Sequence, residues 1–493
     1  MNILLINPRH PDTYWSFRHA IRFILKKASN PPLGLITVSA MLPHEWHKKL
    51  VDLNCHLLND SDIRWADYVF ISAMSIQSDS VSLVIQRCKA LHKKIVAGGP
   101  LFTGDPDSFA DLEHLILNEA EITLPLFLAD LKNNTPKRVY STGDFADLLT
   151  SPVPDYHLIK ASNYAQLSIQ YSRGCPHHCE FCEITALLGH RVRTKSTIQI
   201  LNELENILKT GYRGNIFFVD DNFIGNRHKL KKDLLPAIAA WNRNHKYPFS
   251  FTTEASIDLS DDPALMAGMA EAGFEKVFVG IETVDEVCLK ECDKHLNLQH
   301  NLLESVRKIQ SSGIEVSAGF IVGFDNDSAG IFQRQIDFIQ QSGIITAMVG
   351  LLNAPNHTRL YKRLSGEGRI IHKSGGDNTN YSINFIPKMN LEVLMEGYRS
   401  ILTNIYSNKP YYLRLTGFLK KFEPAVKTRK RITRGKIWAL FRSALFIGII
   451  SKGRLYYWKL VIWSLFTRPK LLPLAITYSI YGYHFRKVYN IDS

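Results

Sequence analysis

Acidic residues are almost absent from the last fifth of this 493-residue chain. Residues 401–493 hold 18 lysines and arginines but only two acids, Glu423 and Asp492, and the whole chain has a formal net charge of +13. The same stretch contains 18 of the 53 aromatic residues. The first 400 residues are therefore slightly acidic. The basic, aromatic end indicates contact with an anionic surface, either a membrane or a nucleic acid.

Long apolar runs are absent as well. The start, MNILLINPRHP, offers no basic segment followed by a long apolar stretch, so we expect no secretory signal. The longest uncharged run in the basic end is Leu471–Phe485, and it contains Pro473 and Gly482. A spanning helix needs about 20 apolar residues, so none is predicted. Seven cysteines, an odd number, indicate reduced thiols and a cytoplasmic location.

Strand-like apolar runs alternate with helical stretches through residues 1–140. They predict a doubly wound, Rossmann-like α/β domain, because parallel strands buried on both faces appear as short β-branched runs. The five runs are NILLINP, KLVDLN, DYVFISAM, KKIVAGGP and HLILNEAE. Ligands bind such sheets beyond the carboxyl ends of the strands, so we expect a ligand-binding domain here.

A proline-rich segment, SPVPDYHL, indicates a linker over residues 141–165. Residues 166–370 then show six further strand–helix units with longer helices. Because a closed barrel of this type has eight units, six predict a partial, TIM-like (βα)6 barrel with its site at the carboxyl ends of the strands. Residues 371–493 become irregular, then helical and basic, which predicts a mainly helical C-terminal region.

Three cysteines follow the first strand of the second domain. Cys175, Cys179 and Cys182 have the spacing C-x3-C-x2-C, and thiolates at such spacing bind zinc or an iron–sulfur cluster. Zinc would need a fourth ligand, and the nearby histidines are His177, His178 and His190. The alternative is a [4Fe–4S] cluster with three protein ligands and one open iron. The place of the cysteines, directly after the first of six strands, favours the cluster.

With the aromatic Phe181 before the last cysteine, this motif resembles that of the radical S-adenosylmethionine (SAM) superfamily. The resemblance implies that SAM binds the open iron and is cleaved to a 5′-deoxyadenosyl radical, while the protein orients the cofactors. It implies SAM contacts at successive strand ends, with Asp220-Asp221-Asn222 in place of the family's Gly-Gly-Glu. The implied SAM-binding residues are Phe181, Asp220, Asp221, Asn222, Glu254, Gly280 and Glu282. No acid or base is predicted, because hydrogen-atom abstraction needs none.

A Rossmann-like domain before such a barrel resembles the cobalamin-binding class of this superfamily. The matching motifs are Asn7-Pro8, Pro31-Pro32-Leu-Gly34, Gly98-Gly99-Pro100 and Glu119-Ala-Glu121. The implied cobalamin-binding residues are Asn7, Pro8, Pro32, Gly34, Ser75, Gln77, Gly98, Gly99 and Glu119. The D-x-H-x-x-G motif that supplies a cobalt ligand in other cobalamin proteins is absent. A dinucleotide-binding domain is the alternative, but no G-x-G-x-x-G follows the first strand.

Five segments resemble the subgroup that contains the hopanoid C-2 methylases: 170–175, 219–226, 253–256, 319–325 and 347–352. The resemblance implies a methyltransferase that acts on an unactivated carbon of an apolar or lipid substrate, with a flavodoxin or ferredoxin as electron donor. Asn356-His357-Thr358 departs from the Pro-Gly-Thr that is frequent in relatives. Two alternatives stay open: a non-methylating radical reaction, and an RNA modifier that uses the basic tail.

Short apolar segments bounded by basic residues surround Trp438, Trp458 and Trp463. This pattern is typical of helices that lie in a bilayer interface, and it predicts peripheral association with the inner face of a membrane rather than nucleic-acid binding. The alternative is a helical cap with a solvated basic face. Elsewhere, residues 229–232 predict a solvated helix face. The remaining cysteines, predicted to be buried free thiols, are Cys55, Cys88, Cys288 and Cys292.

Overall fold

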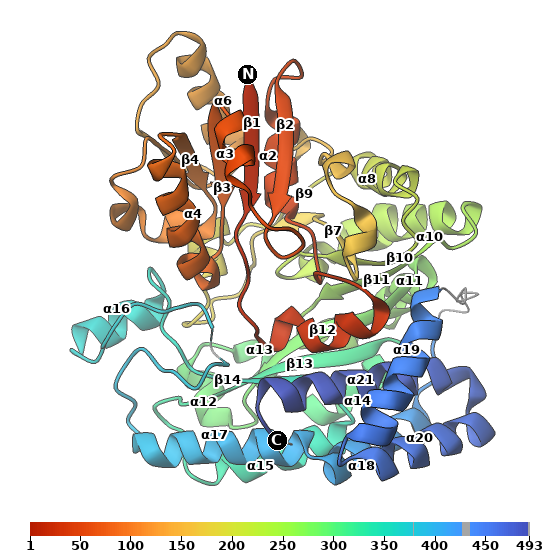
Figure 1. Cartoon of the computed structure of the whole chain (residues 1–493). Helices are drawn as coiled ribbons and strands as arrows, with labels where there is room; N and C mark the ends of the chain where they lie inside the picture. The colour runs from red at the N-terminus through yellow and green to blue at the C-terminus, as the bar shows by residue number, and fades with distance from the viewer. Residues whose placement is uncertain (378, 426–433, 492–493) are drawn as a thin grey trace.

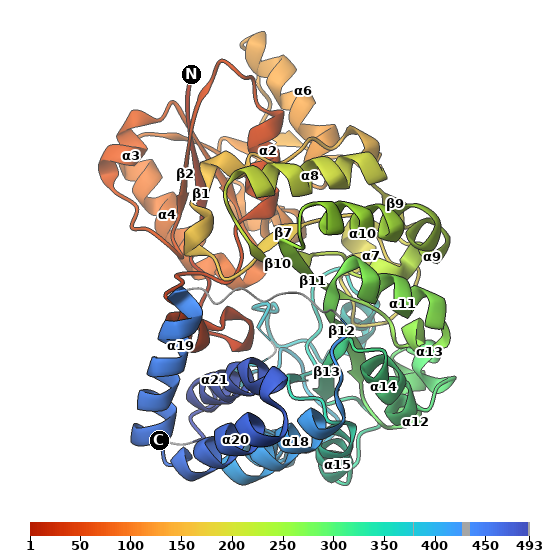
Figure 2. The same cartoon turned by 90° about the vertical axis from the view of Figure 1, so that its right-hand side faces the viewer.

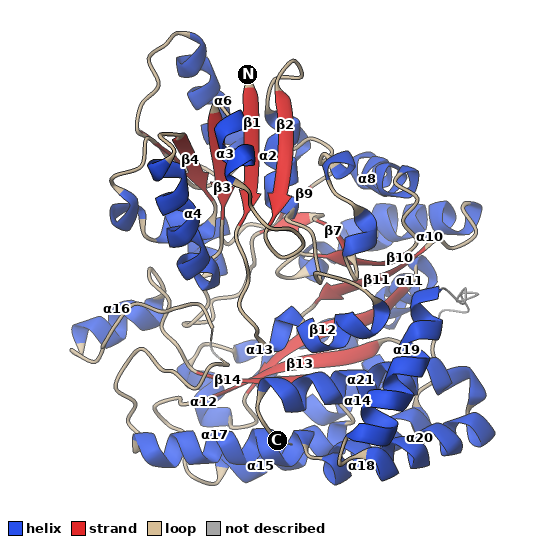
Figure 3. Cartoon of the chain, in the orientation of Figure 1, coloured by secondary structure: helices blue, strands red, loops and turns tan. Residues whose placement is uncertain are grey.

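Two parallel sheets and a helical C-terminal region make up the computed structural model of this chain, which describes residues 1–377, 379–425 and 434–491 (Figures 1 and 3). The predicted α/β fold class, with a Rossmann-like sheet before a partial barrel, is confirmed. Among the described residues, no helix is long and apolar enough to cross a membrane. The four cysteines outside the motif are buried and free, as predicted.

The first sheet is fully parallel and has the order β2-β1-β3-β4-β5-β6. Its strands are β1 (Asn2–Asn7), β2 (His47–Asp52), β3 (Tyr68–Ser72), β4 (Lys94–Gly98), β5 (His114–Ile116) and β6 (Val139–Tyr140). Its helices are α2 (Leu33–Met41), α3 (Asp60–Trp65), α4 (Ser78–Ala90), α5 (Pro100–Gly104) and α6 (Ala120–Lys132). All five predicted strands are present. The sixth, β6, is too short to show a periodic pattern in the sequence.

The strand order reverses between β1 and β3, because β2 lies on one side of β1 and all later strands lie on the other. Connections leave the two strands in opposite directions at such a point, and the crevice between them is where doubly wound sheets bind ligands. The predicted residues Asn7 and Pro8 follow β1, and Ser75 and Gln77 follow β3. Four of the residues predicted to bind cobalamin therefore lie at the switch point.

The second sheet is also parallel and has the order β14-β13-β12-β11-β10-β7, so each strand pairs with its neighbour in sequence. Its strands are β7 (Leu167–Ile169), β10 (Gly214–Phe218), β11 (Phe249–Glu254), β12 (Phe274–Glu282), β13 (Glu315–Val322) and β14 (Ala347–Leu351). The six predicted strands are all present. Because β7 and β14 are the two ends of this order, the barrel is open, as expected of six units.

Helices cover the barrel between its strands, and they begin at the edge where the strands end. They are α7 (Ile184–Leu188), α8 (Thr197–Lys209), α9 (Arg227–Lys229), the π-helix η9 (Leu230–Leu234), α10 (Leu235–Asn244), α11 (Pro263–Ala272), α12 (Glu286–Glu291), α13 (His295–Leu298), α14 (Leu302–Ser311), α15 (Ile331–Ser342) and α16 (Arg359–Gly366). Phe218, Phe223, Phe251 and Phe274 pack with ring centroids 5.0–5.6 Å apart. This buried aromatic core fixes the strands whose ends carry the polar site.

The C-terminal region is helical, as predicted, and it packs on the barrel and on the start of the chain. Its helices are α17 (Leu391–Tyr406), α18 (Asn408–Lys421), α19 (Arg434–Leu445), the π-helix η11 (Phe446–Ile450), α20 (Arg454–Thr467) and α21 (Leu472–Val488). Tyr14 stacks on Phe485 with centroids 4.5 Å apart, and the Tyr406 hydroxyl donates to the Ala347 carbonyl at 2.6 Å. Residues from both ends of the chain therefore share one core with β14.

Contacts between the two sheets come from residues that follow their strands. Tyr164, in the linker, donates its hydroxyl proton to Asp52 Oδ2 at the end of β2, 2.8 Å away. Lys373 pairs with Asp105 at 2.8 Å, and His357 Nε2 lies 3.0 Å from the Gly104 carbonyl. Loops that follow the strands of the two sheets therefore meet, and the first sheet lies beside the barrel (Figure 2).

Gly397 tests the packing of the helical region. It lies on α17 (Leu391–Tyr406), and an added Cβ would overlap the buried ring of Phe332 on α15. We expect Gly397→Ala to lower the free energy of unfolding by about 1–3 kcal/mol, measured by urea titration. Gly417 on α18 is the matched control, because its Cβ would meet nothing within 4 Å. Gly417→Ala should raise the value by about 0.5–1 kcal/mol. Equal effects of the two changes would contradict this packing.

Candidate active site

A short hairpin that the sequence did not predict brackets the three motif cysteines. Strand β8 (Ser172–Arg173) pairs antiparallel with β9 (Arg193–Thr194), and residues 174–183 form the loop that we call the cluster loop. Gly174 enters it with φ +91°, and a Cβ there would lie 2.5 Å from the Arg191 carbonyl oxygen. Only glycine fits this close crossing without strain. The hairpin thus holds the loop in a defined place at the end of β7.

Burial raises the pKa of all three motif thiols. The pKa of Cys182 rises to about 12, and those of Cys175 and Cys179 also lie above their usual value. The ammonium of Lys294 opposes this rise at each thiol. Without a metal the thiols are therefore protonated, and binding of iron would release those protons, as is general for thiolate ligands.

The histidines that might complete a zinc site have other neighbours. The rings of His178 and His190 stack with centroids 4.3 Å apart, and His177 Nε2 lies 3.4 Å from Asn222 Nδ2. Within the described residues, no three His, Cys, Asp or Glu side chains converge closely enough to hold a single metal ion. The ligands of a [4Fe–4S] cluster bind different irons and need not converge on one point. The geometry therefore favours the cluster over zinc.

Asp220, predicted to bind SAM, anchors the start of the cluster loop instead. Its carboxylate accepts hydrogen bonds from the Tyr171 amide at 3.1 Å and from both the amide and the hydroxyl of Ser172. Burial raises the pKa of Asp220 to about 7, although these donors oppose the rise. Both oxygens are thus already engaged, and Asp220 connects the end of β10 to the hairpin.

Asp221 and Asn222, next along the chain, keep free acceptors. Asp221 Oδ2 and Asn222 Oδ1 are buried and have no hydrogen-bond partner. Burial raises the pKa of Asp221 to about 6. Buried acceptors without donors are costly, so a ligand that brings N–H groups here would satisfy them. An ammonium or amino group fits this position.

Glu254 ends β11 close to the same acids. Burial, together with the negative charges of Asp221, Asp220 and Glu282, raises its pKa to about 8. The site therefore brings together several carboxylates that have few positively charged side chains beside them. Such a set fits a ligand that carries a positive charge and hydroxyl groups, as SAM does.

Glu282, at the end of β12, is paired with a lysine that the sequence did not indicate. Lys294 Nζ lies 2.9 Å from Glu282 Oε1. Burial lowers the pKa of Lys294, but Glu282 and Cys179 raise it more, so its net pKa is above the usual value. Glu282 adopts φ +64°, and a Cβ on Gly280 would overlap Glu282 Oε1 and lie 3.0 Å from Lys294 Nζ. Gly280 therefore leaves room for an ion pair beside the thiols.

The first sheet contributes an amide network at its switch point. Asn7 Nδ2 donates to Asp52 Oδ1 at 3.0 Å, and Gln77 Nε2 donates to the Pro8 carbonyl at 2.5 Å. Ser75 and Ile76 lie against Gly376 of the C-terminal region. These bonds fix the ends of β1, β2 and β3, so the residues predicted for cobalamin form one edge.

The glycines predicted for cobalamin differ in their surroundings. A Cβ on Gly98 would lie 2.7 Å from the Ile116 carbonyl oxygen, and Gly99 has φ +94°, so both are required by the fold. Gly34 follows Pro32 in the first turn of α2, and a Cβ there would meet nothing within 4 Å. Internal packing does not require glycine at position 34. Its open surroundings fit a ligand that approaches the backbone closely.

Glu119, predicted to bind cobalamin, instead ties the first domain to the hairpin. Arg193 Nη1 lies 2.7 Å from Glu119 Oε2, and Arg173 Nη1 lies 3.1 Å from Glu119 Oε1. Arg173 also pairs with Glu121 at 2.8 Å. We call these four residues the hairpin clamp. Its side chains are at most 14% exposed, and single-sequence patterns do not reveal such long-range pairs.

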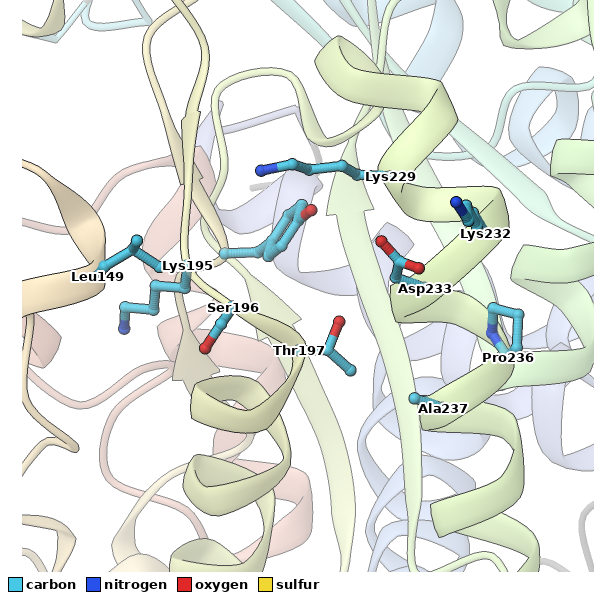
Figure 4. A pocket seen from close by; sticks show the side chains of 10 residues that line it. Leu149, Lys195, Ser196, Thr197, Lys229, Lys232, Asp233, Pro236 and Ala237 are labelled. Carbon is cyan, nitrogen blue, oxygen red and sulfur yellow. The ribbon is translucent and has the colours of Figure 1, made fainter.

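A hollow of about 750 Å³ lies outside this site, between α8 and α10 (Figure 4). Lys195, Lys229 and Lys232 line it together with Asp233. None of the predicted cofactor residues lines it. Residues 229–232 form an exposed helix face apart from Leu230, as predicted, and Lys231 pairs with Asp262.

Comparisons with known proteins agree with this geometry. Residues 169–339 match the radical SAM superfamily, and residues 358–492 match a family described as a domain of unknown function. The chain is 38% identical, over 98% of its length and 91% of the relative's, to an uncharacterized methyltransferase of Synechocystis sp.. It is 34% identical, over 93% of its length and 88% of the relative's, to a hopanoid C-2 methylase of Rhodopseudomonas palustris.

Two solved structures share the fold. One is the cobalamin-dependent S-adenosylmethionine radical enzyme OxsB with aqua-cobalamin and S-adenosylmethionine bound, with a TM-score of 0.64, 16% identity and coverage of 98% of this chain and 78% of that chain. The other is the radical S-adenosylmethionine methyltransferase TsrM from Kitasatospora setae, with a TM-score of 0.61, 14% identity and 76% coverage of both chains. At these identities the likeness shows the fold alone.

The cysteines give a direct test of the metal site. Replacing Cys175, Cys179 or Cys182 by alanine should abolish the iron content and the visible absorbance of anaerobically reconstituted protein, because a cluster needs all three thiolates. Cys88→Ala is the control, since Cys88 is buried in the first domain away from the loop. It should keep the iron content of the unchanged protein. Full iron binding by the Cys179→Ala protein would exclude this ligand set.

Glu254 gives a pH-dependent test of the acidic site. In the cofactor-free protein its pKa is raised from 4.5 to about 8, so the folded state retains a proton that the unfolded state loses. Its contribution to stability is therefore lost as the pH rises from about 4.5 through 8. The free energy of unfolding of the unchanged protein should therefore fall between pH 5 and pH 8. In the Glu254→Gln protein this fall should be smaller by about 1–2 kcal/mol, measured by urea titration.

The exposed Glu45 is the control for this pH test, and Glu45→Gln should follow the unchanged protein. An identical pH dependence for Glu254→Gln and the unchanged protein would show that Glu254 keeps its ordinary pKa.

Proposed function

This chain belongs to the radical SAM superfamily, and from that premise we propose that it is a cobalamin-dependent C-methyltransferase acting on an unactivated carbon of an apolar, hopanoid-like lipid. The observation that carries the proposal is that the hairpin clamp ties the hairpin of the cluster loop to the first sheet, while the free acceptors after β10 lie beside that loop. Similarity to the hopanoid C-2 methylase over most of both chains supports the lipid.

The residues of the second domain fit the cluster and SAM. Cys175, Cys179 and Cys182 would hold the [4Fe–4S] cluster. The unpaired Asp221 Oδ2 and Asn222 Oδ1 would accept hydrogen bonds from the SAM amino group, and Glu254 would accept them from the ribose hydroxyls. When bound, these cofactors and cobalamin supply a radical that removes hydrogen from carbon and a methyl group that replaces it.

Other residues would position the ligands or the cluster loop. Gly280 leaves room for the Glu282–Lys294 pair, and the Lys294 ammonium offers a partner for the SAM carboxylate. Phe181 lies on the cluster loop with its ring centroid 6.4 Å from that of Phe324. Asp220 would fix the loop rather than bind SAM, because its oxygens already accept bonds from the hairpin.

The first domain would hold cobalamin along its carboxyl edge. We assign the contacts to Asn7, Pro8, Pro32, Gly34, Ser75, Gln77, Gly98 and Gly99. Glu119 would serve the hairpin clamp instead, since both of its oxygens contact arginines. The open surroundings of Gly34 and the fixed amides of Asn7 and Gln77 support this assignment.

Apolar side chains near the barrel fit an apolar substrate. Trp15 is 45% exposed and contacts Phe278 of β12 edge-on at 5.3 Å. Met74, after β3, is 55% exposed. Because a lipid substrate resides in a membrane, the proposal places the protein in the cytoplasm at the inner membrane face. Because the cluster needs single electrons, it also includes a flavodoxin or ferredoxin as electron donor.

An isotope experiment tests this function. The chain is reconstituted anaerobically with iron, sulfide and cobalamin, and is supplied with SAM labelled at its methyl group, a reductant and hopanoid lipids. Mass spectrometry should find the label in the lipid together with 5′-deoxyadenosine. Deoxyadenosine without labelled product would indicate a non-methylating reaction, and label recovered in added RNA would indicate an RNA modifier. Either result would overturn the proposal.

The Glu254→Gln protein also tests SAM binding separately from folding. Glu254→Gln should weaken SAM binding by about tenfold or more, which corresponds to about 1.4 kcal/mol, as measured by equilibrium dialysis. Its iron and cobalamin content should be unchanged. The Glu45→Gln protein should bind SAM like the unchanged protein, and equal affinity of the two variants would remove Glu254 from the SAM site.

A further inference from the structure

We propose that the C-terminal helices dock on the surface of an anionic lipid bilayer. The contact is made by the exposed apolar side chains of residues 437–466, on α19, η11 and α20, which we call the docking face. This inference gives a role to the part of the chain that matches a domain of unknown function. It concerns lipid binding alone and holds whichever molecule the enzyme methylates.

Helix α19 carries apolar residues on its outward side, where an ordinary surface helix is polar. Its outward positions are Ile437, Trp438, Phe441 and Leu445, which share one side at i, i+1, i+4 and i+8 and are 45–63% exposed. Its inward positions include Ala439 and Ser443, which are buried. A helix on a water-facing surface places its apolar stripe inward. The outward stripe of α19 therefore indicates that water is not its environment.

Helix α20 also carries apolar residues on its outward side. Leu455, Trp458, Ile462 and Phe466 face outward with exposures of 40–80%. Ser464 is fully buried on the opposite side, and the buried Tyr457 hydroxyl lies 2.9 Å from Ser443 Oγ of α19. The inner side thus combines this polar contact with the buried apolar cluster of Ala439, Ile447 and Tyr457, while further apolar groups face out. This arrangement recurs in two consecutive helices, so chance exposure of single residues does not explain it.

The two outward sides are continuous at the corner between the helices. Ile449 and Ile450 of η11 are 61% and 63% exposed. Trp458 donates its indole N–H to the Gly448 carbonyl at 2.8 Å, which closes the corner. In both views α19 and α20 lie at the periphery of the molecule (Figures 1 and 2). Residues 437–466 hold 12 of the 30 large hydrophobic side chains that are exposed within the described parts of the chain.

The charges beside this face select a lipid surface. Residues 434–470 contain no Asp or Glu, while the exposed cations Arg454, Lys459 and Lys470 flank the apolar side chains of α20. Trp at the level of the lipid headgroups and Lys or Arg on anionic lipid are the features of interfacial helices. No described helix is long enough to span a bilayer, so the helices would lie in the surface.

The docking face is also connected to the candidate active site. Phe446 of η11 packs on Phe23, with ring centroids 6.0 Å apart. Phe23 belongs to the same N-terminal segment as Trp15, which contacts β12 of the barrel. A bilayer held by α19 and α20 would therefore lie next to the segment that borders the site, which suits delivery of a membrane-dissolved substrate.

Vesicle flotation of the full-length, reconstituted protein tests the docking face. The vesicles are phosphatidylcholine alone or with phosphatidylglycerol. The unchanged protein should float with the anionic vesicles and bind the neutral ones more weakly. Phe441→Ser/Ile462→Ser/Phe466→Ser should reduce binding to anionic vesicles by about tenfold or more, because each change removes apolar area from the interface. Arg454→Glu/Lys459→Glu should abolish the preference for anionic lipid.

Exposed apolar residues elsewhere supply the matched control. Leu57, Leu83 and Ile198 are 64–86% exposed, and the Leu57→Ser/Leu83→Ser/Ile198→Ser protein should float like the unchanged one. Iron content and circular dichroism establish that each variant is folded. Equal flotation of the two triple variants, or no flotation of the unchanged protein, would overturn the proposal. The proposal would also be overturned if the unchanged protein bound no vesicles but self-associated, and the docking-face variant lost that self-association. RNA that binds the protein and displaces the vesicles would overturn it too.

Discussion

The hairpin clamp is the interaction on which the rest of this structure depends. Arg173 and Arg193 extend from the hairpin that carries the cysteines, and they pair with Glu119 and Glu121, which follow β5 of the first sheet. Burial raises the pKa of Glu121, but the guanidinium of Arg173 lowers it more, so its net pKa is below the usual value. Removing one partner from such a buried pair leaves an unpaired charge, which costs several kcal/mol. Because Arg173 is two residues before Cys175, the clamp fixes the cluster loop relative to the first sheet.

The candidate site itself shows the opposite electrostatics. Asp221 and Glu254 are close enough to repel each other, and their pKa values are raised mainly by burial. Lys294, beside Glu282 and the thiols, is a cation on the other side of this set. A ligand with an ammonium, a carboxylate and ribose hydroxyls complements both sides. Such a ligand would supply the hydrogen-bond donors that these acids do not receive from the protein.

Periodic and local features could be predicted from the sequence. The strands of both sheets, apart from β6 and the short hairpin, appear as apolar runs because their cores are buried on both faces. The cysteine spacing likewise identified the cluster loop. The roles of Asp220 and Glu119 could not be predicted, because they depend on partners 48 and 74 residues away. Lys294 lies in no recognisable motif. The tryptophans and basic residues of the tail suggested a bilayer, but only the structure shows that the apolar sides of α19 and α20 face outward.

One site, closed by the hairpin clamp, would bring the cluster and cobalamin together. Electron paramagnetic resonance of the anaerobically reconstituted protein tests this when the cluster and the cobalt are both reduced to paramagnetic states. We expect a magnetic interaction between the two centres, seen as splitting or faster relaxation of the cobalt signal. We also expect Arg173→Gln/Arg193→Gln to weaken the interaction at equal iron and cobalt content. Two independent spectra from fully loaded protein would contradict a shared site.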